Sequence, residues 1–347
     1  MITRSPVKVQ RASDTLPIRL PTAESAWQRQ LAGVVRDPAE LCRRLALDPG
    51  WLSGAMQGHA LFEVRVPEAY LSRIRPGDPD DPLLRQVLPL ASERHAAPGF
   101  VDDPLAERDH TPRRGLIHKY HGRVLLIASP TCAINCRYCF RRHFPYADNA
   151  PSRAQWEATL DYLREDASIR EVILSGGDPL AASDRQLAWL VAQLDAIPHL
   201  SRLRIHTRLP VVIPDRVDGA LLDWLSATRL QKVVVLHINH ANEIDAAVIE
   251  ACTRLKAAGV ALLNQSVLLR GVNDTVPALE TLSERLFEAG ILPYYLHVLD
   301  AVRGAAHFDV PDDEARELVA GLRRVLPGFL VPRLVREIPG APSKTPL

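Results

Sequence analysis

The chain has 347 residues, of which 42 are Lys or Arg and 41 are Asp or Glu, so its formal net charge is +1. This balance gives no electrostatic reason to expect a nucleic-acid or membrane partner. No stretch reaches the roughly 18 apolar residues of a membrane helix, and the first residues form no apolar signal core. We therefore expect a cytoplasmic protein in a reducing compartment, where thiolates stay available for metal.

Residues 1–100 show helical patterns and carry no chemical motif. Thr22 is a candidate N-cap for a helix over residues 23–35. Further helices are expected over residues 38–47, 51–61 and 67–74. We interpret this N-terminal helical region as a cap that packs on the main domain or on a partner subunit.

The second region, residues 101–347, alternates apolar runs with helical patterns. The repeat is about 30 residues, the size of a βα unit. Near-continuous apolar strands that alternate with helices are typical of a parallel sheet. The apolar runs fall at residues 123–128, 171–174, 203–206, 232–238, 261–269 and 292–299. Six such units predict an α/β fold, a partial (β/α)6 barrel rather than a doubly wound sheet.

Three of the five cysteines, Cys132, Cys136 and Cys139, have C-x3-C-x2-C spacing directly after the first apolar run. Disulfides need an even count and an oxidising compartment, and a structural zinc site needs four ligands. Three thiolates can each bind one iron of a cubane cluster and leave the fourth iron open. The spacing resembles the signature of radical S-adenosylmethionine (SAM) enzymes, with zinc as the alternative. Cys42 and Cys252 lie in helical patterns and are interpreted as buried, inert thiols.

Polar residues follow the other predicted strands, where a βα barrel has its ligand site. The second strand ends in Ser175, Gly176, Gly177 and Asp178. Two glycines allow a backbone to approach a ligand and offer N–H groups to a carboxylate, although a tight βα turn is the better explanation of the glycines taken alone. Later polar segments lie at residues 206–208, 237–240, 264–274 and 293–300. Because five strand ends turn polar, we expect a shared polar pocket.

Residues 115–347 resemble the lysine 2,3-aminomutase family, radical SAM enzymes that also use pyridoxal phosphate (PLP). The resemblance rests on six blocks: His118-Lys-Tyr-His-Gly-Arg-Val, Cys136-Arg-Tyr-Cys-Phe-Arg-Arg-His-Phe-Pro-Tyr, Ser175-Gly-Gly-Asp-Pro-Leu, His237-Ile-Asn-His-Ala-Asn-Glu, Asn264-Gln-Ser-Val-Leu-Leu-Arg and Pro293-Tyr-Tyr. A seventh, Pro82-Leu-Leu-Arg-Gln-Val, is similar to the short subgroup that makes (R)-β-lysine for the modification of elongation factor P (EF-P).

The resemblance implies a 4Fe–4S cluster held by the three cysteines of the motif. Its open iron chelates the amino and carboxylate groups of SAM. The residues expected to line SAM are Ser175, Gly176, Gly177 and Asp178, with His237 and Gln265 nearby.

The resemblance also implies a Schiff base between PLP and Lys344, a residue that on its own would be read as part of a solvated tail. Lys119 and Arg123 match positions that bind the PLP phosphate, and His297 stands where relatives have a tyrosine that contacts PLP. This arrangement requires residues 337–347 to fold over the barrel mouth, with three prolines limiting the freedom of the tail.

For the substrate, L-lysine, Arg141 matches the arginine that pairs with the carboxylate, a bidentate task that suits guanidinium. Asp300 and Glu337 match the two acids that bind the ε-ammonium. The implied reaction is an intramolecular amino transfer from L-lysine to (R)-β-lysine, catalysed by an isomerase. The implied partners are an electron donor such as a flavodoxin or ferredoxin and, through a functional link, EF-P and its lysyl-ligase.

Two departures from the family pattern affect these expectations. Clostridial-type members continue past the PLP lysine, whereas this sequence ends at Leu347, so their subunit interface and zinc site are not expected here. Glu337 replaces an aspartate and is one methylene longer.

A glutamate aminomutase is disfavoured, because two acids would repel a side-chain carboxylate. A metal-bound scaffold without turnover is the second alternative, which the colour of the purified protein distinguishes.

Overall fold

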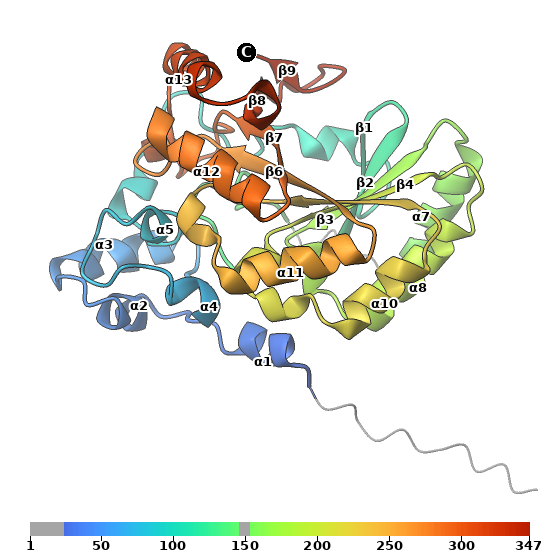
Figure 1. Cartoon of the computed structure of the whole chain (residues 1–347), viewed down its shortest axis with the longest axis horizontal. Coiled ribbons are helices and arrows are strands. Elements are labelled where there is room, and N and C mark those ends of the chain that lie inside the picture. Colours follow the sequence, from blue (N-terminus) through green and yellow to red (C-terminus); the bar gives the residue numbers. More distant parts are fainter. Residues whose placement is uncertain (1–23, 146–152) are drawn as a thin grey trace, which may run out of the picture.

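The computed structural model of the chain describes residues 24–145 and 153–347, and the proposed N-cap Thr22 lies outside these residues. Short helices make up the described part of the N-terminal region (Figure 1). They are α1 (Ala26–Ala32), α2 (Pro38–Arg44), α3 (Gly50–His59), α4 (Glu68–Leu71) and α5 (Pro82–Arg85), followed by the 3-10 helix η1 (Ala91–Arg94); a second 3-10 helix, η2 (Glu107–His110), comes just after this region. The prediction of a helical N-terminal region is confirmed over these residues.

Local chain signals explain where these helices begin. Helix α1 starts after Ser25, whose backbone N–H donates to the Gln28 side chain at 3.0 Å. Helix α2 starts at Pro38, and the Asp37 carboxylate accepts from the Ala39 N–H at 3.0 Å. Proline fits the first turn of a helix, where its missing N–H has no partner to lose. Helices α3 and α4 begin close to the predicted positions and end earlier than predicted.

One sheet, whose strands follow one another in chain order, organises the described part of the second region. Strands β2 to β8 run parallel, and β1 and β9 pair antiparallel with their neighbours. The strands are β1 (Leu116–Tyr120), β2 (Arg123–Ser129), β3 (Glu171–Gly176), β4 (Arg202–Thr207), β5 (Gln231–Leu236), β6 (Ala261–Val267), β7 (Leu292–His297), β8 (Arg333–Arg336) and β9 (Thr345–Pro346). The six predicted strands are β2 to β7.

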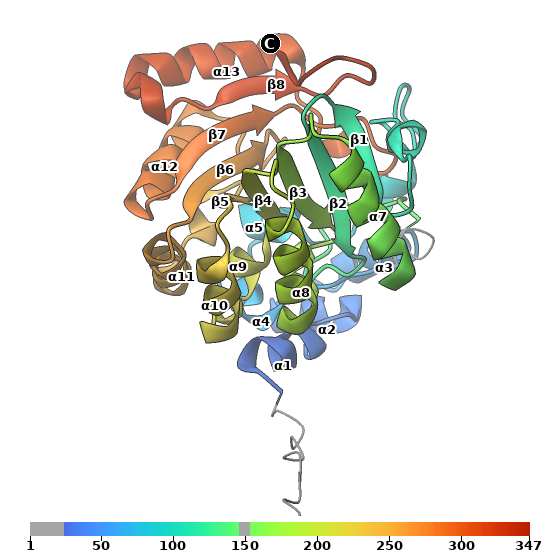
Figure 2. The same ribbon diagram turned by 90° about the vertical axis from the view of Figure 1, so that its right-hand side faces the viewer.

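The sheet curves into a barrel. The barrel is open because the edge strands β1 and β9 do not pair with each other. Helices cover its outer face (Figure 2). They are α7 (Arg153–Glu165), α8 (Asp184–Asp195), α10 (Gly219–Ala227), α11 (Ala246–Ala257), α12 (Val276–Glu288) and α13 (Asp312–Val325), with the short α9 (Leu209–Val212) after β4. The predicted partial barrel is confirmed and is extended by β8. Among the described residues, no helix is long and apolar enough to cross a membrane.

One hydrophobic core joins the N-terminal helices to the barrel. Leu41 in α2 and Leu84 in α5 belong to the same buried cluster as Leu126 in β2 and Leu174 in β3. Burial of a leucine side chain typically contributes about 1.5–3 kcal/mol, so helices and barrel stabilise each other. The helical region therefore packs on the barrel of its own chain, which is one of the two expected arrangements. The domain boundary at residue 100 stays a prediction.

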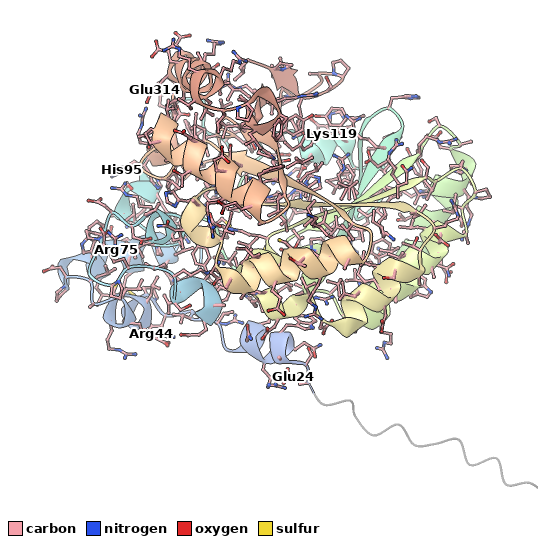
Figure 3. All side chains as sticks on the ribbon, in the orientation of Figure 1. Glu24, Arg44, Arg75, His95, Lys119 and Glu314 are labelled. Atoms are coloured by element: carbon pink, nitrogen blue, oxygen red, sulfur yellow. The ribbon has the colours of Figure 1, made fainter. Side chains whose placement is uncertain are left out.

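The end of the chain returns to the sheet. Strand β9 pairs with β8 through Arg336 and Thr345, so that the segment between them closes into a loop. Lys119 on β1 is mostly buried, with 11% of its side chain exposed. Charged side chains such as Arg44 and Arg75 lie instead on the outside of the molecule (Figure 3). Lys119 on β1 and the returning tail at β9 therefore lie at the two edges of the sheet.

Candidate active site

A cavity of about 560 Å³ opens at the carboxyl ends of the strands, and every site residue predicted from the sequence lines it. Cys132 follows β2, Gly176 ends β3, His237 follows β5 and His297 ends β7. In parallel βα folds these strand ends meet at one face, so the chain order alone brings the polar segments together. The expected shared pocket is therefore present, while the ligand of each residue stays a prediction.

The three cysteines lie in the loop after β2 and face the cavity. Burial raises the pKa of Cys132 well above its usual range and that of Cys139 to about 11. Both thiols are therefore protonated until a metal binds and displaces the protons. Within residues 24–145 and 153–347, no three Cys, His, Asp or Glu side chains converge on a single ion position. The three thiols lie together in one loop of the cavity wall.

The N-terminal region anchors the cysteine loop through buried ion pairs. Arg137 is fully buried and donates to both oxygens of Glu93, at 2.9 and 2.5 Å. Arg142 donates to the same carboxylate at 2.6 Å. The Arg137 backbone N–H also donates to the Gln86 carbonyl at 2.9 Å. Sequence reasoning found no chemical role for this region, and the two arginines that flank the cysteines were the available signal.

The glycine turn after β3 packs directly against the cysteine loop. A Cβ on Gly176, whose φ is +128°, would lie 2.3 Å from the Ser129 carbonyl oxygen, and one on Gly177 would lie 2.7 Å from Thr131. The Gly177 N–H donates to the Ser129 carbonyl at 2.8 Å. The Gly177 N–H is therefore used by the adjacent loop and is not offered to a ligand carboxylate, which agrees with the alternative of a tight βα turn.

The Asp178 carboxylate is hydrogen-bonded to the end of the neighbouring strand β4. Its carboxylate accepts from the Thr207 hydroxyl at 2.6 Å and from the backbone N–H groups of Leu180, Arg208 and Leu209 at 2.8–3.0 Å. Burial raises the pKa of Asp178 even though these donors oppose the shift. Asp178 thus fixes the cavity wall at the ends of β3 and β4.

Arg141 forms a bidentate pair with Glu107, a residue that sequence reasoning missed. Its Nε and Nη2 donate to the two Glu107 oxygens at 2.8 and 2.7 Å, and only 7% and 6% of the two side chains are exposed. Its Nη1 donates to the Ser175 hydroxyl at 3.0 Å. The Glu107 pair thus fixes one edge of the guanidinium and directs Nη1 toward the end of β3.

A cluster of lysines and acids lines the other side of the cavity. Glu337 accepts from Lys119 Nζ at 3.0 Å and from Lys344 Nζ at 2.9 Å. Burial would raise the pKa of Glu337, but the two lysines outweigh it and lower the pKa to about 2. Burial, with the nearby Glu337 charge, raises the pKa of Asp300 to about 7. The tail does fold over the barrel mouth as expected, since β9 pairs with β8 and Lys344 lines the cavity.

Several buried polar atoms in the cavity wall have no hydrogen-bond partner among the described residues. They are Nε2 of His206, His237 and His297, and Oε1 of Gln265. Burial lowers the pKa of His237 to about 4 and lowers the pKa values of His206 and His297 well below their usual range, so all three are neutral at pH 7. Buried polar groups almost always have partners, so these atoms fit a site that is completed by polar cofactors.

Residues 126–280 match the sequence pattern of the Radical SAM superfamily. The chain is 53% identical to the L-lysine 2,3-aminomutase of Escherichia coli over 92% of this chain and 94% of that protein. It is 48% identical to that of Haemophilus influenzae, over 93% and 95%, and 37% identical to that of Clostridium subterminale, over 92% and 77%.

Among solved structures, a radical SAM methyltransferase from Sphaerobacter thermophilus is similar at a TM-score of 0.44 and 18% identity, over 64% of this chain and 68% of that one. This likeness is too low to bear on function. The relatives in sequence, in contrast, are matched over most of their length. The chain belongs to the lysine 2,3-aminomutase family of radical SAM enzymes, whose cofactors are a 4Fe–4S cluster, SAM and PLP.

Proposed function

We propose that this protein is an L-lysine 2,3-aminomutase, an isomerase that moves the α-amino group of L-lysine to Cβ and gives (R)-β-lysine. The observation that carries the proposal is that one cavity contains both the three-cysteine loop and the cluster of Lys119, Lys344, Asp300 and Glu337. When bound there, the cluster, SAM and PLP supply the radical chemistry. The protein binds and orients these groups and keeps water away from them.

The proposal assigns the cofactor sites residue by residue. Cys132, Cys136 and Cys139 hold the cluster. Ser175, Gly176, Gly177 and Asp178 form the wall beside SAM, and the unpartnered polar atoms of His237 and Gln265, which line the same cavity, are assigned to contact it. Lys344 attaches PLP, while Lys119 and Arg123 neutralise its phosphate and His297 contacts its ring.

The substrate site uses opposite charges at its two ends. Arg141 binds the lysine carboxylate, and Asp300 and Glu337 bind the ε-ammonium. Glu337 already holds two lysine ammonium groups at 2.9 and 3.0 Å, so its carboxylate suits a third when Lys344 is engaged with PLP. The extra methylene of Glu337 gives it the reach to bridge Lys119 and Lys344.

The proposal extends to partners and location. A flavodoxin or ferredoxin would supply the electron, and the product would serve the lysyl-ligase that modifies EF-P. The support is the resemblance of the Pro82 block to the short subgroup and the match to 94% and 95% of the length of two relatives. A cytoplasmic location fits the thiolate chemistry of the three cysteines.

The proposed activity is tested by anaerobic incubation of reconstituted protein with L-lysine, SAM, PLP and dithionite, with chromatographic detection of β-lysine. We expect β-lysine to accumulate only when both SAM and reductant are present. Glutamate offered in place of lysine should give no β-amino product, because Asp300 and Glu337 repel its side-chain carboxylate. Cleavage of SAM without β-lysine would refute the substrate assignment and leave the radical SAM core intact.

Asp300→Asn should lower kcat/KM for lysine by about 10²- to 10⁴-fold. Loss of one partner from a buried ion pair costs roughly 3–5 kcal/mol. Cluster absorbance and PLP content should stay at the parent level. Asp309→Asn is the matched control, because Asp309 is exposed on the same segment and lies outside the cavity wall. Equal kcat/KM in Asp300→Asn and the control would place the ammonium site elsewhere.

The same residue predicts a pH dependence. Burial, reinforced by Glu337, raises the pKa of Asp300 to about 7, so below this pH the acid is neutral and binds an ammonium weakly. We therefore expect kcat/KM for lysine to rise with pH through about 7 and then level off. A pH profile of Asp300→Asn should lack this rise. An identical profile in both proteins would assign the titration to another group.

Glu107→Gln should raise KM for lysine at least tenfold, because Arg141 loses the charged partner that fixes its Nε–Nη2 edge. Glu107→Asp keeps the charge and should recover part of the affinity. Asp109→Asn, an exposed change on the same 3-10 helix, should behave as the parent does. Steady-state kinetics at constant cluster content measures these effects, and an unchanged KM in Glu107→Gln would show that Arg141 does not bind the substrate.

A further inference from the structure

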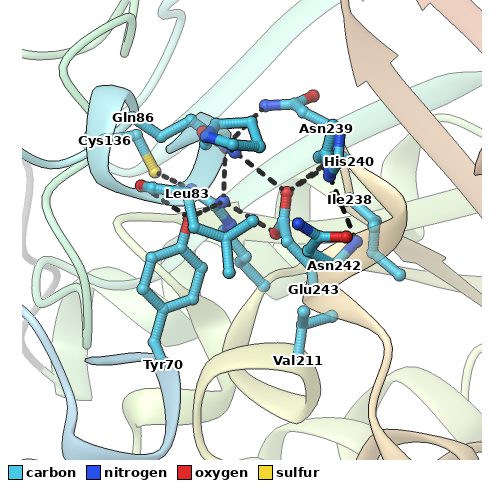
Figure 4. Close-up of polar contacts among 12 residues, drawn as sticks. Tyr70, Leu83, Gln86, Cys136, Val211, Ile238, Asn239, His240, Asn242 and Glu243 are labelled. Carbon is cyan, nitrogen blue, oxygen red and sulfur yellow. Dashed lines mark hydrogen bonds and ion pairs between the residues drawn. The ribbon is translucent and has the colours of Figure 1, made fainter. Parts of the chain in front are cut away.

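A buried guanidinium, that of Arg208, lies against the second cysteine of the motif. Arg208 directly follows β4 and is 6% exposed. Its Nη1 lies 2.7 Å from Cys136 Sγ, and Figure 4 shows Cys136 together with the neighbouring Gln86 and Glu243. None of the roles proposed above uses Arg208, although it lines the same cavity.

A network of buried groups fixes this guanidinium. Its Nη2 donates to Glu243 Oε2 at 2.8 Å and to Gln86 Oε1 at 2.7 Å (Figure 4). Glu243 is fully buried, and its Oε1 accepts from the backbone N–H groups of Asn239 and His240 at 2.9 and 3.1 Å. Because both carboxylate oxygens have fixed donors, Glu243 in turn holds the orientation of Arg208 toward Cys136.

Arg208 also has a spare donor. Its Nε is buried and has no hydrogen-bond partner among the described residues. Buried donors without partners are rare in folded proteins. The guanidinium therefore offers Nη1 to the cysteine sulfur and retains Nε for a further acceptor. A cluster on Cys136 would bring sulfur acceptors to this face of the cavity.

We propose that Arg208, oriented by Glu243, sets the reduction potential of the cluster that Cys136 holds. The inference rests on the proposed cluster site. Reduction adds one electron from the external donor and increases the negative charge on the cluster, while Arg208 itself gains and loses nothing. A fixed positive charge and N–H donors at the sulfur stabilise the reduced form, since hydrogen bonds and net charge tune the potentials of iron–sulfur centres. Arg208 is thus a positioning residue that acts through the cluster.

The arrangement predicts shifts of opposite sign for the two partners of the ion pair. Arg208→Gln removes the positive charge and leaves Glu243 uncompensated, so the midpoint potential should fall. Glu243→Gln removes the negative charge and leaves Arg208, so the potential should rise. We expect each change to alter the reduction equilibrium constant at least tenfold, which is about 59 mV for one electron. Arg208→Lys keeps the charge and should shift the potential less than Arg208→Gln does.

The experiment is a redox titration of the reconstituted full-length protein, followed by electron paramagnetic resonance of the reduced cluster, with iron content measured in parallel. Arg216→Gln is the matched control. Arg216 is a fully buried arginine paired with Asp184 at 2.7 Å, and it lies outside the cavity wall. Its variant should keep the parent potential.

Potentials equal to the parent's in both Arg208→Gln and Glu243→Gln, with iron content intact, would overturn the inference. If Arg208→Gln fails to assemble a cluster, Glu243→Gln decides: a rise supports the inference and an unchanged or lower potential overturns it. A parent protein without any cluster would instead refute the proposed function. The two failures are therefore distinguished by the spectrum of the parent.

Discussion

Replacement of any one of Cys132, Cys136 or Cys139 by alanine should abolish the reductive cleavage of SAM, and with it all formation of β-lysine. Each thiolate is proposed to bind a different iron, so that each loss leaves one iron without a protein ligand. Burial raises the pKa of Cys132 and Cys139, so their thiolates depend on the charge of the bound metal. Iron and sulfide analysis, visible absorbance and assay of 5′-deoxyadenosine measure the effect.

The other two cysteines provide the controls for this experiment. Cys42 and Cys252 are 6% and 0% exposed and belong to the hydrophobic core, outside the cavity wall. Burial raises the pKa of Cys252 to about 12, as expected for an inert thiol. Cys42→Ala and Cys252→Ala should keep cluster and SAM cleavage. A full cluster spectrum together with SAM cleavage in Cys136→Ala would remove the assignment.

The barrel strands could be predicted from the sequence because their signal is local. Strands β2 to β7 are apolar runs that end in polar residues, and both features lie within a few positions of each other. Strand β1 reads Leu-Ile-His-Lys-Tyr and pairs only at the sheet edge, so it lacks the continuous apolar pattern. Strands β8 and β9 are short, and β9 exists only because the tail returns to β8.

The partners that orient the site could not be predicted in the same way. Glu107 pairs with Arg141 across 34 positions of sequence, and Glu243 pairs with Arg208 across 35. Which acid faces which arginine depends on how loops pack in three dimensions, and an isolated acid in a loop has no periodicity that reveals it. Arg208 was predicted only as part of a polar strand end. Its orientation toward Cys136 follows from the buried network.

The second large effect is expected from the loss of Lys344, which lies in the tail. Lys344, in the tail, and Lys119, on β1, both donate to the Glu337 carboxylate, at 2.9 and 3.0 Å. Both lysines line the cavity, so proximity alone leaves two candidates for the attachment of PLP. Lys344 lies 5.8 Å from the centroid of the Tyr295 ring, within the range of a cation–π contact. The antiparallel pairing of β8 with β9 holds the backbone next to Lys344 in place.

Lys344→Ala should abolish β-lysine formation and the covalent attachment of PLP, while the cluster and its reduction remain. Borohydride treatment of the PLP-loaded parent, followed by peptide mapping, should place the pyridoxyl group on Lys344. Lys119→Ala should keep this label and bind PLP more weakly, because it loses only a charge for the phosphate. Lys232→Ala, outside the cavity wall, should match the parent. A label on Lys119 or Lys232, with Lys344→Ala still active, would show that PLP is attached outside the tail and would remove the role proposed for Lys344.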